Sequence, residues 1–116
     1  MKARAIARNI GMSPRKMRLV IDQIRGRGVN EAYAILQYSK KLAAQPIDKA
    51  LRSAVANAVY QADEQGQPLD VDGLVVSEAF VDEGRTLRRY RARAFGRATP
   101  ILKRSSHVTV VVEMKE

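Results

Sequence analysis

Hydrophobic positions along the chain change their spacing from one segment to the next, which predicts a mixed α and β fold. Residues 2–10 alternate loosely, as is typical of a short strand. A helix is predicted to begin at Ser13-Pro14. The serine side chain can cap the first turn, and proline is tolerated there because a backbone N–H in the first turn has no partner within the helix. The apolar face of this helix consists of Met17, Val20, Ile21 and Ile24. Gly26 ends the helix.

Two further helices are predicted in the middle of the chain. The first covers about residues 30–38, with an apolar stripe of Ala32, Ile35 and Leu36. The second runs from about residue 43 or 46 to residue 63, with the pattern Ile47, Ala50, Leu51, Ala54, Val55, Ala58, Val59 and Ala62. Because alanines let other elements approach closely, we interpret this helix as core and not as a cofactor site. Gly66-Gln67-Pro68 is the break after it.

From Leu69 onward the hydrophobic period changes to two, which predicts strands. One strand ends at about Asp82, with Leu74, Val76 and Phe80 on one face, and another covers Ser105 to Val112. The roughly twenty residues between them are too many for a structureless loop in a small domain. A hairpin from Val75 to Val111 would have its midpoint at Arg93 and arms of roughly 60 Å.

The predicted fold class is therefore α+β, with three helices packed on a small antiparallel sheet and a long protruding β-hairpin. We expect residues 1–116 to form a single domain. Its globular body would comprise residues 1–76 and 108–116, and the extended basic hairpin about residues 77–107. Because a bare two-stranded hairpin is only marginally stable in water, this one is expected to need a surface to lie on.

The charge of the chain is concentrated in two segments. Lys and Arg number 21 against 12 Asp and Glu, for a formal net charge of +9. Residues 1–28 carry +7 and residues 84–104 carry +8 with no acid, while residues 29–83 carry −5. This asymmetry favours a directed contact with an anion: nucleic acid, an anionic membrane surface or an acidic protein. Arg15, Lys16 and Arg18 at the start of the first helix favour a phosphate near that end.

Catalytic and metal chemistry find little support in these residues, so we expect no enzyme activity, cofactor or metal. The chain has no cysteine, and His107 is its one histidine, so a common zinc site cannot form. Asp82 and Glu83 are adjacent and point to opposite faces of a strand. No apolar run approaches the roughly 20 residues that span a bilayer, and residues 1–8 do not resemble a secretory signal. We expect a mature, soluble, intracellular protein.

The basic hairpin has three possible uses at this point. It can lie within a folded RNA, enter a DNA groove as a β-ribbon, or act as a disordered basic arm. Tyr90 and Phe95 lie among the arginines, where they can stack on unpaired bases or pack across the two strands. The residues alone leave both readings open.

Several stretches, in order and at matching spacing, resemble the bacterial-type ribosomal protein L22 family. They are residues 13–20 (SPRKMRLV) with Asp22, Ile24, Arg25 and Gly26, residues 53–58 (SAVANA), residues 81–84 (VDEG), residues 93–94 and 96–98, and residues 101–110 (ILKRSSHVTV). The chain departs from the family pattern at Arg85, Arg91, Phe95 and Thr99-Pro100. These departures bear on the hairpin tip and leave the fold unchanged.

The resemblance implies a structural protein of the large ribosomal subunit in the cytoplasm, which binds 23S-type rRNA, assists assembly and lines the polypeptide exit tunnel with its hairpin tip. The implied partners are large-subunit rRNA, neighbouring ribosomal proteins, the nascent polypeptide and macrolide-type ligands, with no membrane and no homo-oligomer. Charge and resemblance together predict rRNA contacts at Arg4, Arg8, Ser13, Arg15, Lys16, Arg18, Arg25, Arg27, Arg85, Arg88, Arg89, Arg91, Arg93, Arg97, Lys103 and Arg104. The tunnel-lining tip would comprise Leu87, Arg88, Arg89, Arg93, Gly96, Arg97 and Ala98. The alternative is a free nucleic-acid-binding regulator that uses a basic β-ribbon and self-associates symmetrically.

Overall fold

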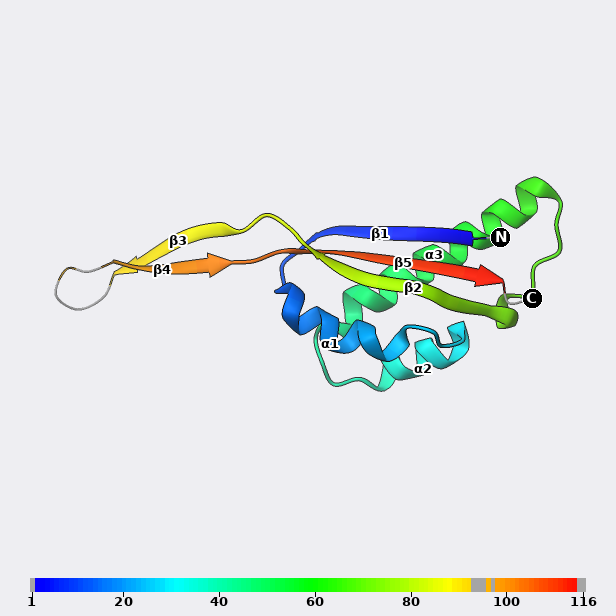
Figure 1. Ribbon diagram of the computed structural model, residues 1–116, viewed down its shortest axis with the longest axis horizontal. Coiled ribbons are helices and arrows are strands. Elements are labelled where there is room, and N and C mark those ends of the chain that lie inside the picture. Colours follow the sequence, from blue (N-terminus) through cyan, green and yellow to red (C-terminus); the bar gives the residue numbers. More distant parts are fainter. Residues whose placement is uncertain (1, 93–95, 97, 115–116) are drawn as a thin grey trace.

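The structure, a computed structural model, describes residues 2–92, 96 and 98–114. Its elements are β1 (Lys2–Ile10), α1 (Pro14–Ile24), α2 (Val29–Tyr38), α3 (Ala44–Gln65), the short 3-10 helix η1 (Val71–Gly73), β2 (Leu74–Glu83), β3 (Leu87–Ala92), β4 (Ala98–Lys103) and β5 (Ser106–Met114). Three helices pack against an antiparallel sheet, and a two-stranded ribbon extends from it (Figure 1). The predicted α+β class is confirmed.

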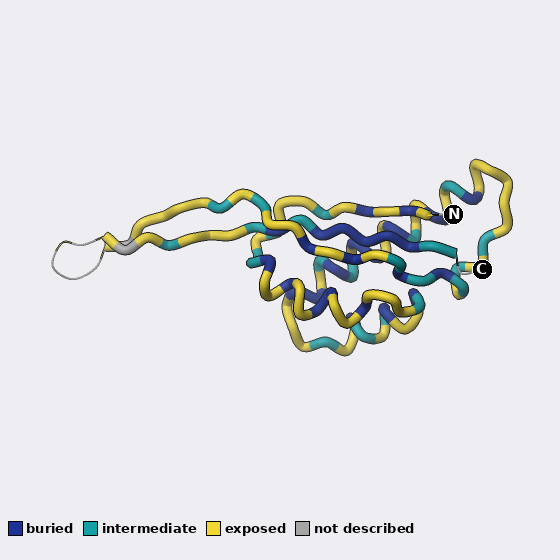
Figure 2. The backbone as a smooth tube through the Cα atoms, viewed as in Figure 1, coloured by how far each residue is buried: buried dark blue, intermediate teal, exposed yellow. Residues whose placement is uncertain are grey.

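The body is a two-layer structure. Its sheet has the order β1-β5-β2, with both outer strands antiparallel to β5. One face is apolar and lies under the helices, so that Ala5, Val110 and Ala79 form one buried row across the three strands. Figure 2 shows the resulting core as a buried band confined to the body. Small residues on β1 let α3 pack closely on the sheet, as its alanine stripe predicted.

Helix α1 confirms the predicted apolar face, because Met17, Val20, Ile21 and Ile24 are fully buried. Ser13 occupies the N-cap position with an extended backbone, and Pro14 follows at the start of the helix. The serine side chain makes no capping hydrogen bond, so that part of the prediction is wrong. The Ser13 carbonyl accepts the first hydrogen bond of the helix, from the Met17 amide at 3.3 Å, as the carbonyl of an N-cap residue normally does.

A β-bulge in β2 changes which side chains face the core. Pairing with β5 shifts register between Val76 and Glu78. The extra residue reverses the alternation, so Ala79 and Val81 are buried beyond the bulge. Phe80, predicted to share a face with Leu74 and Val76, is instead 41% exposed on the opposite face. The prediction was wrong because strict alternation assumes an unbroken strand.

The α3 stripe is narrower than the pattern predicted. Ile47, Ala50, Leu51, Ala54, Ala58 and Ala62 are buried as expected. Val55 is only half-buried and Val59 is 37% exposed. Gly66 ends the helix in the left-handed conformation, with a φ of 64°, which glycine adopts without steric cost.

The ribbon is formed by β3 and β4, which make a separate two-stranded sheet. Leu87 pairs with Lys103 and Ala92 with Ala98, so the register is centred at position 95. The predicted midpoint, Arg93, lies outside the described residues and two positions before this centre. Val75 lies opposite Glu113 and not Val111, which moves the centre by one position, and register shifts between Val76 and the ribbon move it by a second. The molecule measures 67 × 27 × 16 Å, and its radius of gyration is 17.7 Å. A compact domain of this length would have about 13 Å.

Candidate nucleic-acid interface

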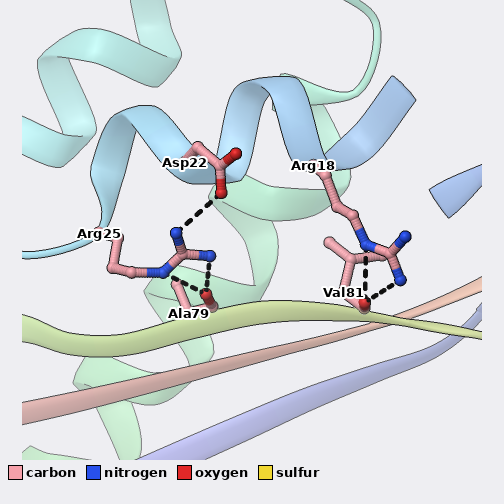
Figure 3. A network of polar contacts seen from close by, with 5 residues as sticks. All are labelled: Arg18, Asp22, Arg25, Ala79 and Val81. Atoms are coloured by element: carbon pink, nitrogen blue, oxygen red, sulfur yellow. Dashed lines mark hydrogen bonds and ion pairs between the residues drawn. The ribbon is translucent and has the colours of Figure 1, made fainter. Parts of the chain in front are cut away.

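Two of the predicted RNA-binding arginines hold α1 against the sheet (Figure 3). Arg18 donates from Nε and Nη2 to the Val81 carbonyl at 3.2 and 2.9 Å. Arg25 donates from Nε and Nη2 to the Ala79 carbonyl at 2.9 and 2.6 Å, and from Nη1 to Asp22 at 2.8 Å. Both guanidinium groups therefore serve the fold, although both residues remain exposed on their outer side.

These contacts cover an edge that would otherwise present unpaired backbone groups. Strand β2 lies at the edge of the sheet. Besides the two arginines, the turn after α1 pairs with it, since the Gly26 amide donates to the Val76 carbonyl and the Val76 amide to the Arg27 carbonyl. On the opposite edge, the Asn57 side chain donates to the Arg4 carbonyl at 2.9 Å. Contacts of this kind leave fewer backbone groups at each edge free to pair with another chain.

The first turns of α1 and the root of the ribbon lie together, although about seventy residues separate them in sequence. Arg15, Arg18 and Arg104 line one hollow of about 380 Å³ beside Glu83. Arg104 lies 3.6 Å from the Glu83 carboxylate, an exposed ion pair that contributes little to stability. The two basic segments of the sequence thus meet at one place on the surface.

A larger groove of about 960 Å³ opens beside this hollow. Lys16, Arg85, Lys103 and Arg104 line it, together with exposed leucines from the root of the ribbon and from the loop between α2 and α3. Sequence reasoning found the cations, assigned Leu87 to the tip of the ribbon, and missed Leu42 and Leu102. The available signal was Leu42, an apolar residue directly after the two lysines of a polar turn.

The junction between body and ribbon is closely packed around Gly84. Its amide donates to the Ser105 carbonyl at 2.9 Å, and the Ser105 hydroxyl donates to the Arg85 carbonyl at 2.7 Å. A Cβ at Gly84 would lie 2.6 Å from the Ser105 hydroxyl oxygen and 3.2 Å from the His107 ring. His107 accepts a hydrogen bond at Nδ1 from the Asn9 amide at 3.0 Å, so it fastens β1 to the junction.

The ribbon presents positive charge on both faces. Adjacent Arg88 and Arg89 point to opposite sides of β3, and Lys103 pairs with Leu87 on the Arg89 side. All three basic residues are exposed. Tyr90 lies opposite Pro100 and is 69% exposed, which leaves most of its ring accessible.

Other predicted site residues lie apart from this junction or outside the described residues. Arg4 and Arg8 are exposed on β1, and Arg27 pairs with Glu31 at 2.9 Å beyond the far end of α1. Arg93, Arg97 and Phe95, with its predicted stacking, lie outside the described residues, and only the backbone of Arg91 is described.

The described residues offer neither a cluster of metal-ligating side chains nor a membrane-spanning helix. No group of three or more His, Cys, Asp or Glu side chains placed to hold a metal ion occurs among residues 2–92, 96 and 98–114. Within that same part of the chain, the helices are too short or too polar to cross a membrane.

Tyr33, on α2, has a perturbed pKa. Burial raises the pKa of Tyr33 above its ordinary value of 10.0, the nearby charge of Arg52 lowers this pKa, and the charge of Asp48 raises it.

Comparison with known proteins agrees with this arrangement of a helix-covered sheet and a basic ribbon. The family described as ribosomal protein L22p/L17e matches residues 5–113. The chain belongs to this family. Its relatives include proteins named large ribosomal subunit protein uL22 from three strains of Bifidobacterium longum: DJO10A, NCC 2705 and the infantis strain ATCC 15697. Each is 51% identical over 116 residues, covering 100% of this chain and 98% of the relative.

Membership in the L22 family confirms the resemblance predicted from the sequence. The match runs through α1, α3, both ribbon strands and β5, so it includes every element that carries the basic surface. These relatives carry the name of a large-subunit component, and that name does not denote an enzyme.

Proposed function

We propose that this protein is a structural component of the large ribosomal subunit and binds large-subunit rRNA. The observation that carries this proposal is the acid-free run of residues 84–104, which carries +8 and exposes Arg88, Arg89 and Lys103 on the two faces of the ribbon. A ribbon of this kind is at best marginally stable in water and repels itself. A polyanion on both sides would offset both effects. Family membership supports the same conclusion.

The proposed mechanism is electrostatic and geometric, with no chemical reaction. Cations of α1 and of the ribbon neutralise phosphates of separate RNA segments, and the ribbon ties these segments together during assembly. The proposed contacts are Arg4, Arg8, Ser13, Arg15, Lys16, Arg18, Arg25, Arg27, Arg85, Arg88, Arg89, Arg91, Arg93, Arg97, Lys103 and Arg104. Of these, Arg18 and Arg25 combine this role with their contacts to β2.

We further propose that the far end of the ribbon lines the polypeptide exit tunnel, where it meets the nascent chain and macrolide-type ligands. The tip predicted from the sequence is Leu87, Arg88, Arg89, Arg93, Gly96, Arg97 and Ala98. Leu87 begins β3 at the root of the ribbon, where it pairs with Lys103, so we assign the tunnel end to the residues beyond it. The 67 Å length of the molecule supports this, because a ribbon rooted in a surface-bound body can reach deep into RNA. Gly96 has a φ of 70°, a turn conformation in which glycine is unstrained.

The chain is proposed to act as one domain, with a body of residues 1–76 and 108–116 and a hairpin of about residues 77–107. The three-stranded sheet continues to Glu83 and Ser106, so the inner part of that hairpin is anchored in the body. The ribbon proper, from about residue 84 to residue 105, is what the RNA would enclose.

Sedimentation tests the proposal. Tagged protein, expressed in a bacterial cell, is expected to sediment with large subunits in the cytoplasmic extract and to stay bound at moderate salt. A version with glutamine at Arg85, Arg88, Arg89, Lys103 and Arg104 should be depleted from that fraction. Protein that remains at the top of the gradient, or that binds a short DNA duplex as a symmetric dimer, would instead support a free regulator.

A further inference from the structure

The groove beside the root of the ribbon joins three parts of the fold. Residues 9, 11–13 and 16 form one wall, the loop between α2 and α3 forms a second, and residues 85, 87 and 102–105 form the third. In Figure 1 this is the place where the ribbon leaves the body, above the start of α1. The volume of about 960 Å³ lies within the range of pockets that hold small organic ligands, about 300–1,000 Å³. We call it the neck groove.

The charge of the neck groove has one sign. Lys16, Arg85, Lys103 and Arg104 line it, and the described lining residues include no Asp or Glu. Lys16, Arg85 and Lys103 come from three different segments and converge on one opening. Three cations that lie together without an acid repel one another, so an anionic occupant would stabilise the groove.

The groove also has apolar walls, which phosphate binding alone does not require. Leu42 is 68% exposed and Leu87 is 42% exposed, and both line the groove. Leu87 pairs directly with Lys103 across the ribbon, so an apolar and a cationic side chain project from the same face. An occupant that satisfies both has an apolar surface and a negative charge a few ångströms apart.

We infer that the neck groove holds one unpaired nucleotide of RNA, with its base against Leu42 and Leu87 and its flanking phosphates on Lys16, Arg85 and Lys103. A base in a duplex is stacked on both faces and offers no free apolar surface, whereas a base in a loop or bulge can be turned out. The inference rests on the proposed function and makes it specific: this part of the protein reads single-stranded RNA, while the ribbon binds phosphates of any RNA structure.

Binding to a defined probe tests this inference in the full chain. The probe is a nine-nucleotide oligouridine with a central 2-aminopurine, and the comparison is a nine-base-pair RNA duplex. The base analogue should shift its emission to shorter wavelength when it enters the apolar groove. The Leu42→Ala, Leu87→Ala double variant should bind the single strand about tenfold more weakly and lose the shift, because it truncates two of the three exposed leucines that line the groove, the third being Leu102. Its affinity for the duplex should be unchanged.

Matched variants separate this effect from misfolding. Leu42→Met with Leu87→Met keeps the apolar volume and should keep both the affinity and the emission shift. Leu19→Ala removes a leucine that is 59% exposed on α1 outside the groove, and should change neither. Thermal melting confirms that each variant is folded.

Each outcome decides between the groove and the wider function. If the alanine variant bound the oligouridine as tightly as the parent does, and the duplex equally well, the groove would not be a nucleotide site. Phosphate binding by the protein would remain supported. Tighter binding of an Asp- and Glu-rich peptide than of the oligouridine would assign the groove to a protein partner and would also overturn it. If the parent protein bound neither RNA, the proposed function itself would fail.

Discussion

Replacing Arg25 by alanine tests whether the arginines of α1 support the fold as well as bind RNA. The substitution removes two hydrogen bonds to the Ala79 carbonyl and one to Asp22. Water can reach the vacated carbonyl, because the arginine side chain is already 46% exposed. Hydrogen bonds to charged groups contribute about 1.5–3 kcal/mol when protected, so at this half-exposed site we expect a loss of about 1 kcal/mol.

That loss corresponds to a fall in Tm of about 4 °C for a chain of this length. Arg18→Ala should cost a similar amount, because Arg18 also donates twice to one carbonyl. Arg25→Lys should recover less than half of the loss, since an ammonium group cannot donate to both acceptors in the same planar geometry.

The assay is thermal unfolding followed by circular dichroism, with Arg15→Ala as the control. Arg15 lies exposed on the first turn of the same helix, so its removal changes the net charge equally. We expect its Tm to stay within about 2 °C of the parent. Equal Tm values for Arg15→Ala and Arg25→Ala would refute the structural role assigned to the edge contacts.

Three further predictions concern the junction and the core. Gly84→Ala should lower the free energy of unfolding by about 1–3 kcal/mol in denaturant titrations, because the new Cβ meets the Ser105 hydroxyl, and adding Ser105→Ala should restore part of it. Ser106→Ala should lower Tm by about 4 °C, since the buried hydroxyl donates to the Met12 carbonyl at 2.6 Å; an unchanged Tm would contradict this. Because the pKa of Tyr33 is raised, the folded state holds the phenolic proton more tightly than the unfolded state. Protonated Tyr33 therefore contributes to the free energy of unfolding below pH 10.0, and this contribution is lost as the pH rises further. Tyr33→Phe should therefore reduce the loss of stability in alkaline titrations.

The body of the fold could be predicted from sequence wherever the spacing of hydrophobic residues alone determined a segment's structure. The apolar face of α1 follows from helical spacing. The hairpin follows from two alternating strands with no helical pattern between them. The position of Phe80 could not be predicted, because a bulge depends on how two distant strands match in register. The offset of Arg93 from the centre of the hairpin has the same cause.

The candidate site was predictable in its charge and not in its shape. Counting charges along the chain identified both basic segments, and folding brings Arg15 and Arg104 together. Nothing local indicates that Arg18 and Arg25 donate to strand carbonyls, since those acceptors lie 63 and 54 residues away, respectively. The contribution of Leu42 to a groove likewise depends on three segments that meet only in the folded chain.

The salt dependence of rRNA binding tests the central claim most directly. With about 8–10 phosphates engaged, log Kd should change with log salt concentration with a slope of about 5–9 in magnitude. Glutamine at Arg85, Arg88, Arg89, Lys103 and Arg104 should reduce that magnitude by about 4, because each lost phosphate contact removes about 0.7–0.9. An unchanged slope in this variant would contradict the claim that the ribbon is held by RNA phosphates.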